Sequence, residues 1–193
     1  MLKLLLLFVE SLVENIANYV PKYHNQINSL KSKDYVIVGY ARKSPGQEDR
    51  QKRINILNRM VQCLVERSMC DKIFVSSSCL ASDSLASRDI DNENDVLADL
   101  TRVDGNTQSM ISYISASEQD ICLVAVDFVG LLTNTNDLYS FISKYEKLKT
   151  IIIDSLPVNH KVHVFQREAV LNNLSSLTPF DCRSKCIQRS KII

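Results

Sequence analysis

The chain has 193 residues, of which 45% are hydrophobic and 23% are charged, and its formal net charge at pH 7 is +1. A chain of this length and composition can bury roughly two-thirds of its unfolded surface, which excludes an intrinsically disordered or a fibrous protein. Its four glycines never occur at the spacing of a Walker A or dinucleotide-binding loop, so no nucleotide is expected as a ligand.

Residues 1–34 are predicted to form an amphipathic helix followed by a linker. Leu5 and Val9 begin an apolar pattern at helical spacing, Pro21 is expected to end the helix, and residues 25–34 have the polar composition of a connection. The apolar run is too short to span a bilayer and has no signal-peptidase site. We therefore expect an intracellular protein, cytoplasmic or nuclear, with no membrane partner and with an N-terminal arm that supports a homodimer.

Short apolar runs alternate with helical patterns over residues 35–155. The predicted strands are residues 35–40, 72–76, 121–126 and 150–153, and the predicted helices are residues 47–67, 94–102, 107–115 and 137–149. Parallel strands need crossover connections, so this order predicts a three-layer α/β/α fold with a mainly parallel sheet of four to five strands. Ligands of such sheets bind beyond the carboxyl ends of the strands. The small polar residues after the second strand favour a mobile loop.

Residues 156–193 are expected to form a basic C-terminal extension. Their pattern predicts a strand at 161–165 and a helix at 167–174, with no assigned place in the sheet. Two basic segments of the chain flank an acidic one, and a basic face is a feature of nucleic-acid-binding proteins. The candidate DNA-binding residues are Arg50, Arg53, Arg183, Lys185 and Arg189.

The loop after the first strand has the sequence GYARKSPGQ over residues 39–47. Its simplest interpretation is a helix start, with Ser44 as the N-cap, Pro45 at the first helical position and Gln47 completing a capping box. Arg42 lies two residues before Ser44 and therefore on the same side of an extended strand. A guanidinium beside a helix N-terminus suits a phosphate group, so the pattern also indicates a phosphate site.

The run Tyr40-Ala-Arg42-Lys-Ser44 resembles the Y-x-R-x-S motif that opens the catalytic domain of serine recombinases, the resolvase/invertase family. The order of elements is similar over residues 35–148, including a Ser-rich loop that is followed by Arg88. The resemblance implies that Ser44 attacks a DNA phosphodiester and stays joined to the 5′ phosphate, while Arg42 and Arg88 bind the scissile phosphate. It implies DNA as a partner and no metal or other cofactor.

One segment departs from the family pattern. The family carries D-R-L-x-R after the third strand, whereas residues 127–133 of this chain read DFVGLLT and lack both arginines. Because these arginines complete the phosphate site, we expect strand exchange to be severely impaired. A catalytically inactive α/β domain of the same fold, used for dimerisation or partner binding, is the alternative.

Two groups of residues have side chains of the kinds that bind metal ions. His160, His163, Cys182 and Cys186 are residue types that suit tetrahedral zinc, but their spacing is not a usual one. The acidic residues between positions 83 and 99 lack the glycine and the closing glutamate of a calcium loop, so they are expected to lie in solvent around a helix start. No metal is therefore predicted, and Cys63, Cys79 and Cys122 are expected in the core.

Overall fold

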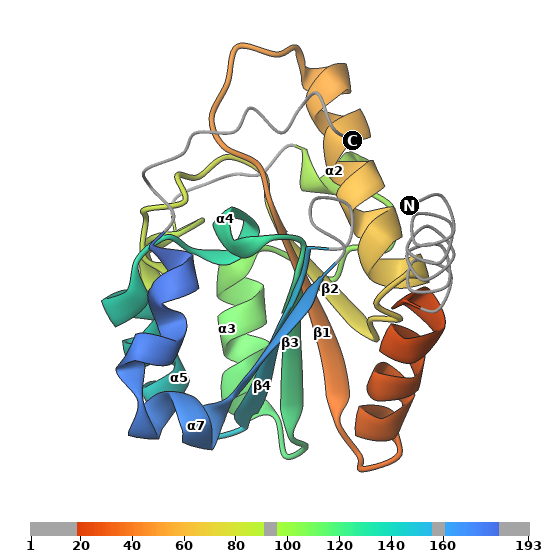
Figure 1. Ribbon diagram of the computed structural model, residues 1–193. Helices are drawn as coiled ribbons and strands as arrows, with labels where there is room; N and C mark the ends of the chain where they lie inside the picture. Colours follow the sequence, from red (N-terminus) through yellow and green to blue (C-terminus); the bar gives the residue numbers. More distant parts are fainter. Residues whose placement is uncertain (1–18, 91–95, 156–160, 182–193) are drawn as a thin grey trace, which may run out of the picture.

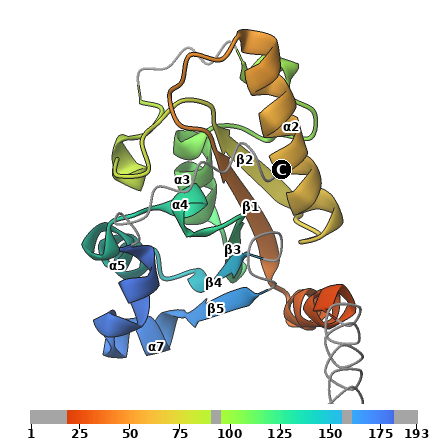
Figure 2. The ribbon, with the colours of Figure 1, turned by 45° about the horizontal axis from the view of Figure 1, so that its top comes forward.

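A computed structural model of the chain describes residues 19–90, 96–155 and 161–181. Its centre is one five-stranded sheet with the strand order β2-β1-β3-β4-β5, which is visible in Figure 2. The strands are β1 (Val36–Arg42), β2 (Lys72–Ser76), β3 (Ile121–Ala125), β4 (Leu148–Asp154) and β5 (Val162–Gln166). The first four strands are parallel, and β5 pairs with β4 in the antiparallel direction.

Helices cover both faces of this sheet (Figure 1). One face packs against α3 (Thr107–Ala116), α4 (Phe128–Leu131), α5 (Thr135–Lys144), α7 (Arg167–Asn172) and the 3₁₀ helix η3 (Leu174–Phe180). The other face packs against α2 (Arg50–Glu66) and against the helical residues 19–31. The predicted three-layer α/β/α fold with a mainly parallel sheet is confirmed. Because β3 is covered on both faces, it is apolar throughout, and every one of its residues is buried.

The N-terminal part of the described chain differs from the prediction. Residues 19–31 are helical, so Pro21 does not end the helix and residues 25–31 are not a linker. Tyr23 and Ile27, four residues apart, are almost fully buried against the sheet. This burial stabilises a helix whose polar composition by itself indicates a connection.

Two other predicted helices differ from the structure, and one predicted strand is confirmed. The predicted helix 137–149 is too long, because α5 ends at Lys144 and the buried Leu148 already pairs with Ile121 in the sheet. The predicted helix 94–102 is wrong over its described part, where only the short 3₁₀ turn η2 (Leu97–Asp99) forms. The predicted strand in the C-terminal extension is confirmed as β5, and it joins the sheet at an edge.

Two predicted features lie outside the described residues: residues 1–18 of the proposed dimerisation arm, and the basic residues of the segment 182–193. Within the described ranges, none of the helices has the length and apolar character that crossing a bilayer requires.

Gly39, in the middle of β1, allows α2 and the turn before β2 to approach the sheet. A Cβ atom at this position would lie 2.9 Å from Cys70 Sγ and 3.2 Å from Leu64 Cδ1. Glycine weakens a strand interior, so its presence there indicates a close approach of neighbouring atoms. The Cys70 side chain occupies the space that a larger residue in β1 would need.

We expect Gly39→Ala to lower the free energy of unfolding by about 1–3 kcal/mol, because the added methyl group overlaps Cys70 and Leu64. In urea denaturation, the Gly39→Ala/Cys70→Ala double variant should recover most of this loss. Gly130→Ala is the control and should not be destabilised, since nothing lies within 4 Å of a Cβ there. If Gly39→Ala lowered the free energy of unfolding by the same amount in the unaltered chain and in a Cys70→Ala background, the close packing of Gly39 against Cys70 would be contradicted.

Candidate functional site

The loops that follow β1 and β2 lie side by side at the carboxyl edge of the sheet. The Lys43 amide donates to the Ser76 carbonyl at 3.0 Å, and the Cys79 amide donates to the Lys43 carbonyl at 3.2 Å. These bonds continue the pairing of the two strands past their ends. They place Ser44 in the loop 43–49, at the edge where ligands of parallel sheets bind.

Arg42 and Ser44 are brought together as the sequence predicts. Arg42 Nη1 donates a hydrogen bond of 3.0 Å to Ser44 Oγ. Ser44 is half-buried, and its hydroxyl hydrogen has no acceptor among the described residues. Arg42 is buried, which lowers the pKa of its guanidinium, and the nearby charge of Arg88 acts in the same direction.

The helix N-terminus is not at Ser44, and the predicted capping box is wrong. The N-cap of α2 is Asp49, whose carboxylate accepts a 2.8 Å hydrogen bond from the Lys52 amide. Pro45 and Gln47 lie in the loop, before the first turn of the helix. Asp49 satisfies an amide that would otherwise lack a partner, so the helix begins there rather than five residues earlier.

Arg42 also holds carbonyl groups from two other segments. Its Nη1 donates to the Cys79 carbonyl at 2.5 Å, and its Nε and Nη2 donate to the Val129 carbonyl at 3.2 and 2.9 Å. A guanidinium has five N–H groups, and four of those on Arg42 are used in this way or on Ser44. Within the described part of the chain, the remaining N–H on Nη2 has no acceptor.

Arg88 is only 2% exposed, and all five of its N–H groups have acceptors. Nη1 donates to the Tyr40 hydroxyl at 3.1 Å and to the Leu131 carbonyl at 2.7 Å. Nη2 donates to the Ala81 and Asp83 carbonyls, and Nε donates to the Asp83 carbonyl again. Arg88 therefore connects the Ser-rich loop after β2 to β1 and α4, and that loop is held by hydrogen bonds at several carbonyls.

A buried hydrogen-bond chain leads from Arg88 to a carboxylate. The Tyr40 hydroxyl accepts from Arg88 and lies 3.0 Å from Thr107 Oγ1, which is 2.5 Å from Asp89 Oδ2. Asp89 Oδ1 accepts from the Ser76 hydroxyl at 2.9 Å. Burial raises the pKa of Tyr40, so this hydroxyl keeps its proton. The expectation that the acidic residues around position 89 lie in solvent is wrong for Asp89, because the ends of β2 and α3 enclose it.

The segment after β3 forms the short helix α4. Asp127 has a φ of +70°, a strained value for a residue with a side chain, and its carboxylate accepts from the Phe128 amide at 2.6 Å. Phe128 and Leu131 stand where the family motif has arginine. Leu131 is fully buried, and the Phe128 ring lies 4.9 Å from that of Phe180. Apolar packing therefore occupies both positions, and neither side chain carries a charge.

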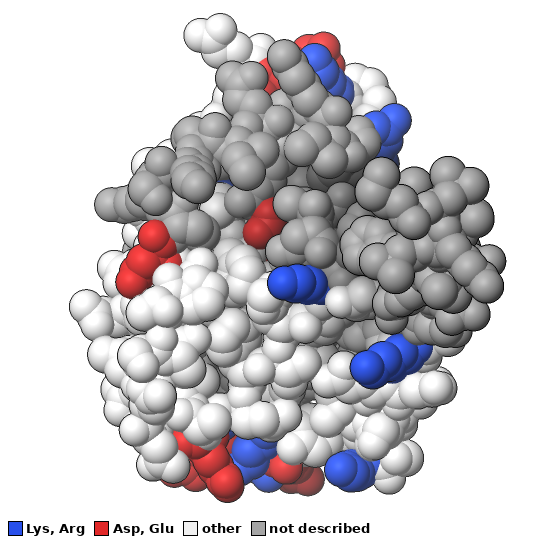
Figure 3. Space-filling model, viewed as in Figure 1, with Lys and Arg blue, Asp and Glu red and all other residues white. Residues whose placement is uncertain are grey.

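The candidate DNA-binding residues have different surroundings. Arg50 is exposed and forms an ion pair of 2.5 Å with Asp99, whereas Arg53 is only 9% exposed. The other three candidates, Arg183, Lys185 and Arg189, lie outside the described residues. Figure 3 shows one face of the molecule, on which Lys and Arg are scattered rather than gathered into a patch.

Comparisons of this chain with protein families, with curated proteins and with solved structures found no match. The described ranges contain no group of three or more His, Cys, Asp or Glu side chains that could hold a metal ion. Of the four candidate zinc ligands, only His163 lies within these ranges, where its ring centroid lies 5.0 Å from that of Phe128.

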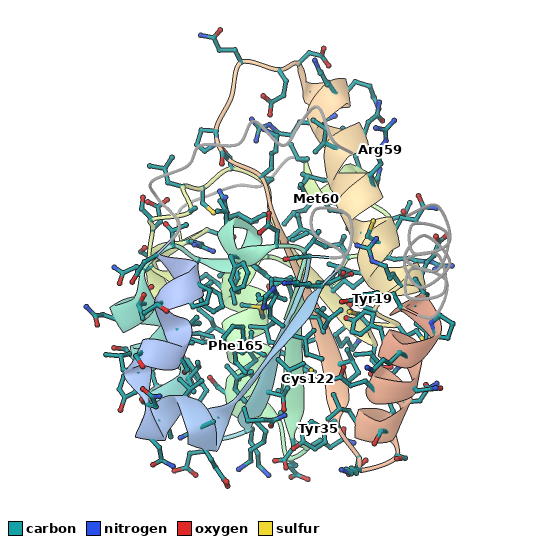
Figure 4. All side chains as sticks on the ribbon, viewed as in Figure 1. Tyr19, Tyr35, Arg59, Met60, Cys122 and Phe165 are labelled. Atoms are coloured by element: carbon teal, nitrogen blue, oxygen red, sulfur yellow. The ribbon has the colours of Figure 1, made fainter. Side chains whose placement is uncertain are left out.

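We expect Arg88→Lys to lower the free energy of unfolding by about 3 kcal/mol or more, because lysine has three donors and cannot reach the separate acceptors that Arg88 bridges. Urea denaturation measures the loss. Arg59→Lys is the control: Arg59 lies on the outer side of α2 (Figure 4), and its change should stay within about 0.5 kcal/mol. An unchanged stability of Arg88→Lys would show that Arg88 does not hold these loops.

Proposed function

We propose that this chain is a serine-recombinase-like protein that acts on DNA, with Ser44 as the nucleophile and with impaired strand exchange. The proposal rests on the 3.0 Å hydrogen bond from Arg42 Nη1 to the half-buried Ser44 Oγ. A serine hydroxyl is a weak nucleophile, and an adjacent cation favours its deprotonated form and the charge that develops on a phosphate. The mainly parallel five-stranded sheet is also the architecture that the resemblance implies.

In the proposed reaction, Ser44 Oγ forms a bond to the phosphorus of a DNA phosphodiester and the bond from phosphorus to the 3′ oxygen breaks. The serine releases its proton to solvent, and the departing 3′ oxygen takes one up. The phosphoserine ester conserves the free energy of the broken bond, so rejoining needs no nucleotide. The unused N–H of Arg42 Nη2 is a donor for the phosphate oxygens.

The expected impairment follows from a lack of free cationic donors besides Arg42 among the described residues at this edge. Every N–H group of Arg88 is bonded within the protein, and Phe128 and Leu131 carry no charge. Loss of one preorganised donor in a transition state typically costs on the order of 10²–10³ in rate. The absence of two or more donors therefore predicts a very slow cleavage step.

A catalytically inactive domain of the same fold, used for dimerisation or partner binding, is the second candidate. It is favoured by the complete use of the Arg88 donors on carbonyl groups and on the Tyr40 hydroxyl. A phosphate could bind Arg88 only if at least one of these bonds broke. The formation of a covalent intermediate on Ser44 separates the two candidates.

With suicide DNA substrates that trap cleaved strands, we expect a covalent protein–DNA adduct that forms on the order of 10⁴ times more slowly than with an intact serine recombinase, or slower still. Denaturing gel electrophoresis measures the adduct. Ser44→Ala should abolish it, and Ser78→Ala, which removes an exposed serine hydroxyl from the loop after β2 at the same edge, is the control. If no Ser44-dependent adduct forms at any time, the inactive-domain candidate is correct.

We expect the chain to bind duplex DNA weakly and with little sequence preference, because its described surface has scattered positive charge. Truncation after Asp181 should weaken binding further, since it removes Arg183, Lys185, Arg189 and Lys191. This end point keeps the buried Phe180 of η3. Fluorescence anisotropy across a salt series measures both affinity and slope, and each lost phosphate contact lowers the slope by about 0.9. Tight, salt-insensitive binding to one sequence would contradict this prediction.

A further inference from the structure

Arg53, in the first turn of α2, directs its guanidinium at the loop that carries Ser44. Its Nη1 donates to the Ser77 carbonyl at 2.5 Å and to the Ser44 carbonyl at 3.3 Å. Its Nη2 lies 3.5 Å from the Gly46 carbonyl oxygen and 2.8 Å from Glu48 Oε1. The side chain is 10% exposed, so these contacts lie under the loop and not on its outer surface.

Glu48 joins this guanidinium to the other end of the loop. Its Oε1 also forms a 2.8 Å ion pair with Lys43 Nζ, which donates to the Ser44 carbonyl as well. The hydrogen bond from Lys43 lowers the pKa of Glu48, so the carboxylate is ionised at neutral pH. A Cβ at Gly46 would lie only 2.1 Å from Glu48 Oε2, so glycine leaves room for Glu48 to fold back over the loop.

Ser44 is thus held from two sides by two different arginines. Arg42 bonds to its hydroxyl group, and Arg53 bonds to its carbonyl group from the next helix. If Ser44 were held only at its hydroxyl group, its backbone could still turn and carry the side chain away from Arg42. The second hydrogen bond, at the carbonyl group, restricts this rotation of the backbone. The Arg53 contacts therefore limit the directions in which Oγ can point.

From these contacts we infer that Arg53 is a positioning residue for Ser44 and not a contact for DNA phosphates. The inference rests on the proposed function, since it concerns the same serine. Arg53 acts by holding the main chain of residues 44–46 while Glu48 compensates its charge. Productive geometry at a nucleophile is sensitive, because a shift of about 1 Å can cost on the order of 10² in rate.

The test compares Arg53→Gln with Arg59→Gln, which removes the same charge from the exposed side of α2. We expect Arg53→Gln to slow adduct formation on Ser44 on the order of 10²-fold, while its DNA affinity and salt slope match those of Arg59→Gln. Arg53→Lys should recover part of the rate. A salt slope lower by about 0.9 than that of Arg59→Gln, with a matching loss of affinity, would assign Arg53 to a phosphate contact and overturn the inference.

Two further measurements keep this test decisive. If Arg53→Gln does not fold, as judged by circular dichroism, Glu48→Gln removes the partner of Arg53 and should slow the adduct without weakening DNA binding. If the unaltered chain forms no adduct, the proposed function fails, and amide hydrogen exchange tests the inference by itself. Faster exchange of residues 43–49 in Arg53→Gln than in Arg59→Gln then supports it, and equal exchange overturns it.

Discussion

Buried guanidinium groups that bond to backbone carbonyls hold together the carboxyl edge of the sheet. The loops after β1, β2 and β3 have no regular partners there, and a buried carbonyl without a hydrogen bond costs free energy on the order of 1–3 kcal/mol. Arg42, Arg53 and Arg88 each donate to carbonyls from at least two segments. Arginine suits this role because its five donors spread in a fixed plane and stay charged when buried.

The same N–H group cannot serve a carbonyl and a phosphate at once. Arg88 uses all of its donors to stabilise the fold, whereas Arg42 keeps one N–H group next to Ser44. At the positions of the family arginines, Phe128 and Leu131 extend the core that α4 shares with η3. This edge of the sheet therefore combines strong structural support with the pair of Arg42 and Ser44, on which the proposed phosphate chemistry rests.

The central strands and the helices between them were predictable because the spacing of apolar residues along the chain indicates which side chains are buried. The apolar runs at β1, β3 and β4 are covered on both faces, and a strand in that position has no polar side. The helix at residues 19–31 was not predictable in the same way, because Tyr23 and Ile27 are its only fully buried apolar residues and most of the residues around them are polar. The start of α2 was misplaced because Ser44 and Asp49 are both good N-caps, and only the loop contacts decide between them.

The sequence by itself determined the α/β class, the mainly parallel sheet and the pairing of Arg42 with Ser44, since two residues that are two positions apart in a strand end share one side. Only the tertiary structure decided what Arg53 and Arg88 do. Their acceptors include the Ser77 carbonyl, 24 positions from Arg53, and the Leu131 carbonyl, 43 positions from Arg88. A motif records which residue types are close along the chain, but a buried cation is defined by the carbonyl groups that the folded loops bring around it.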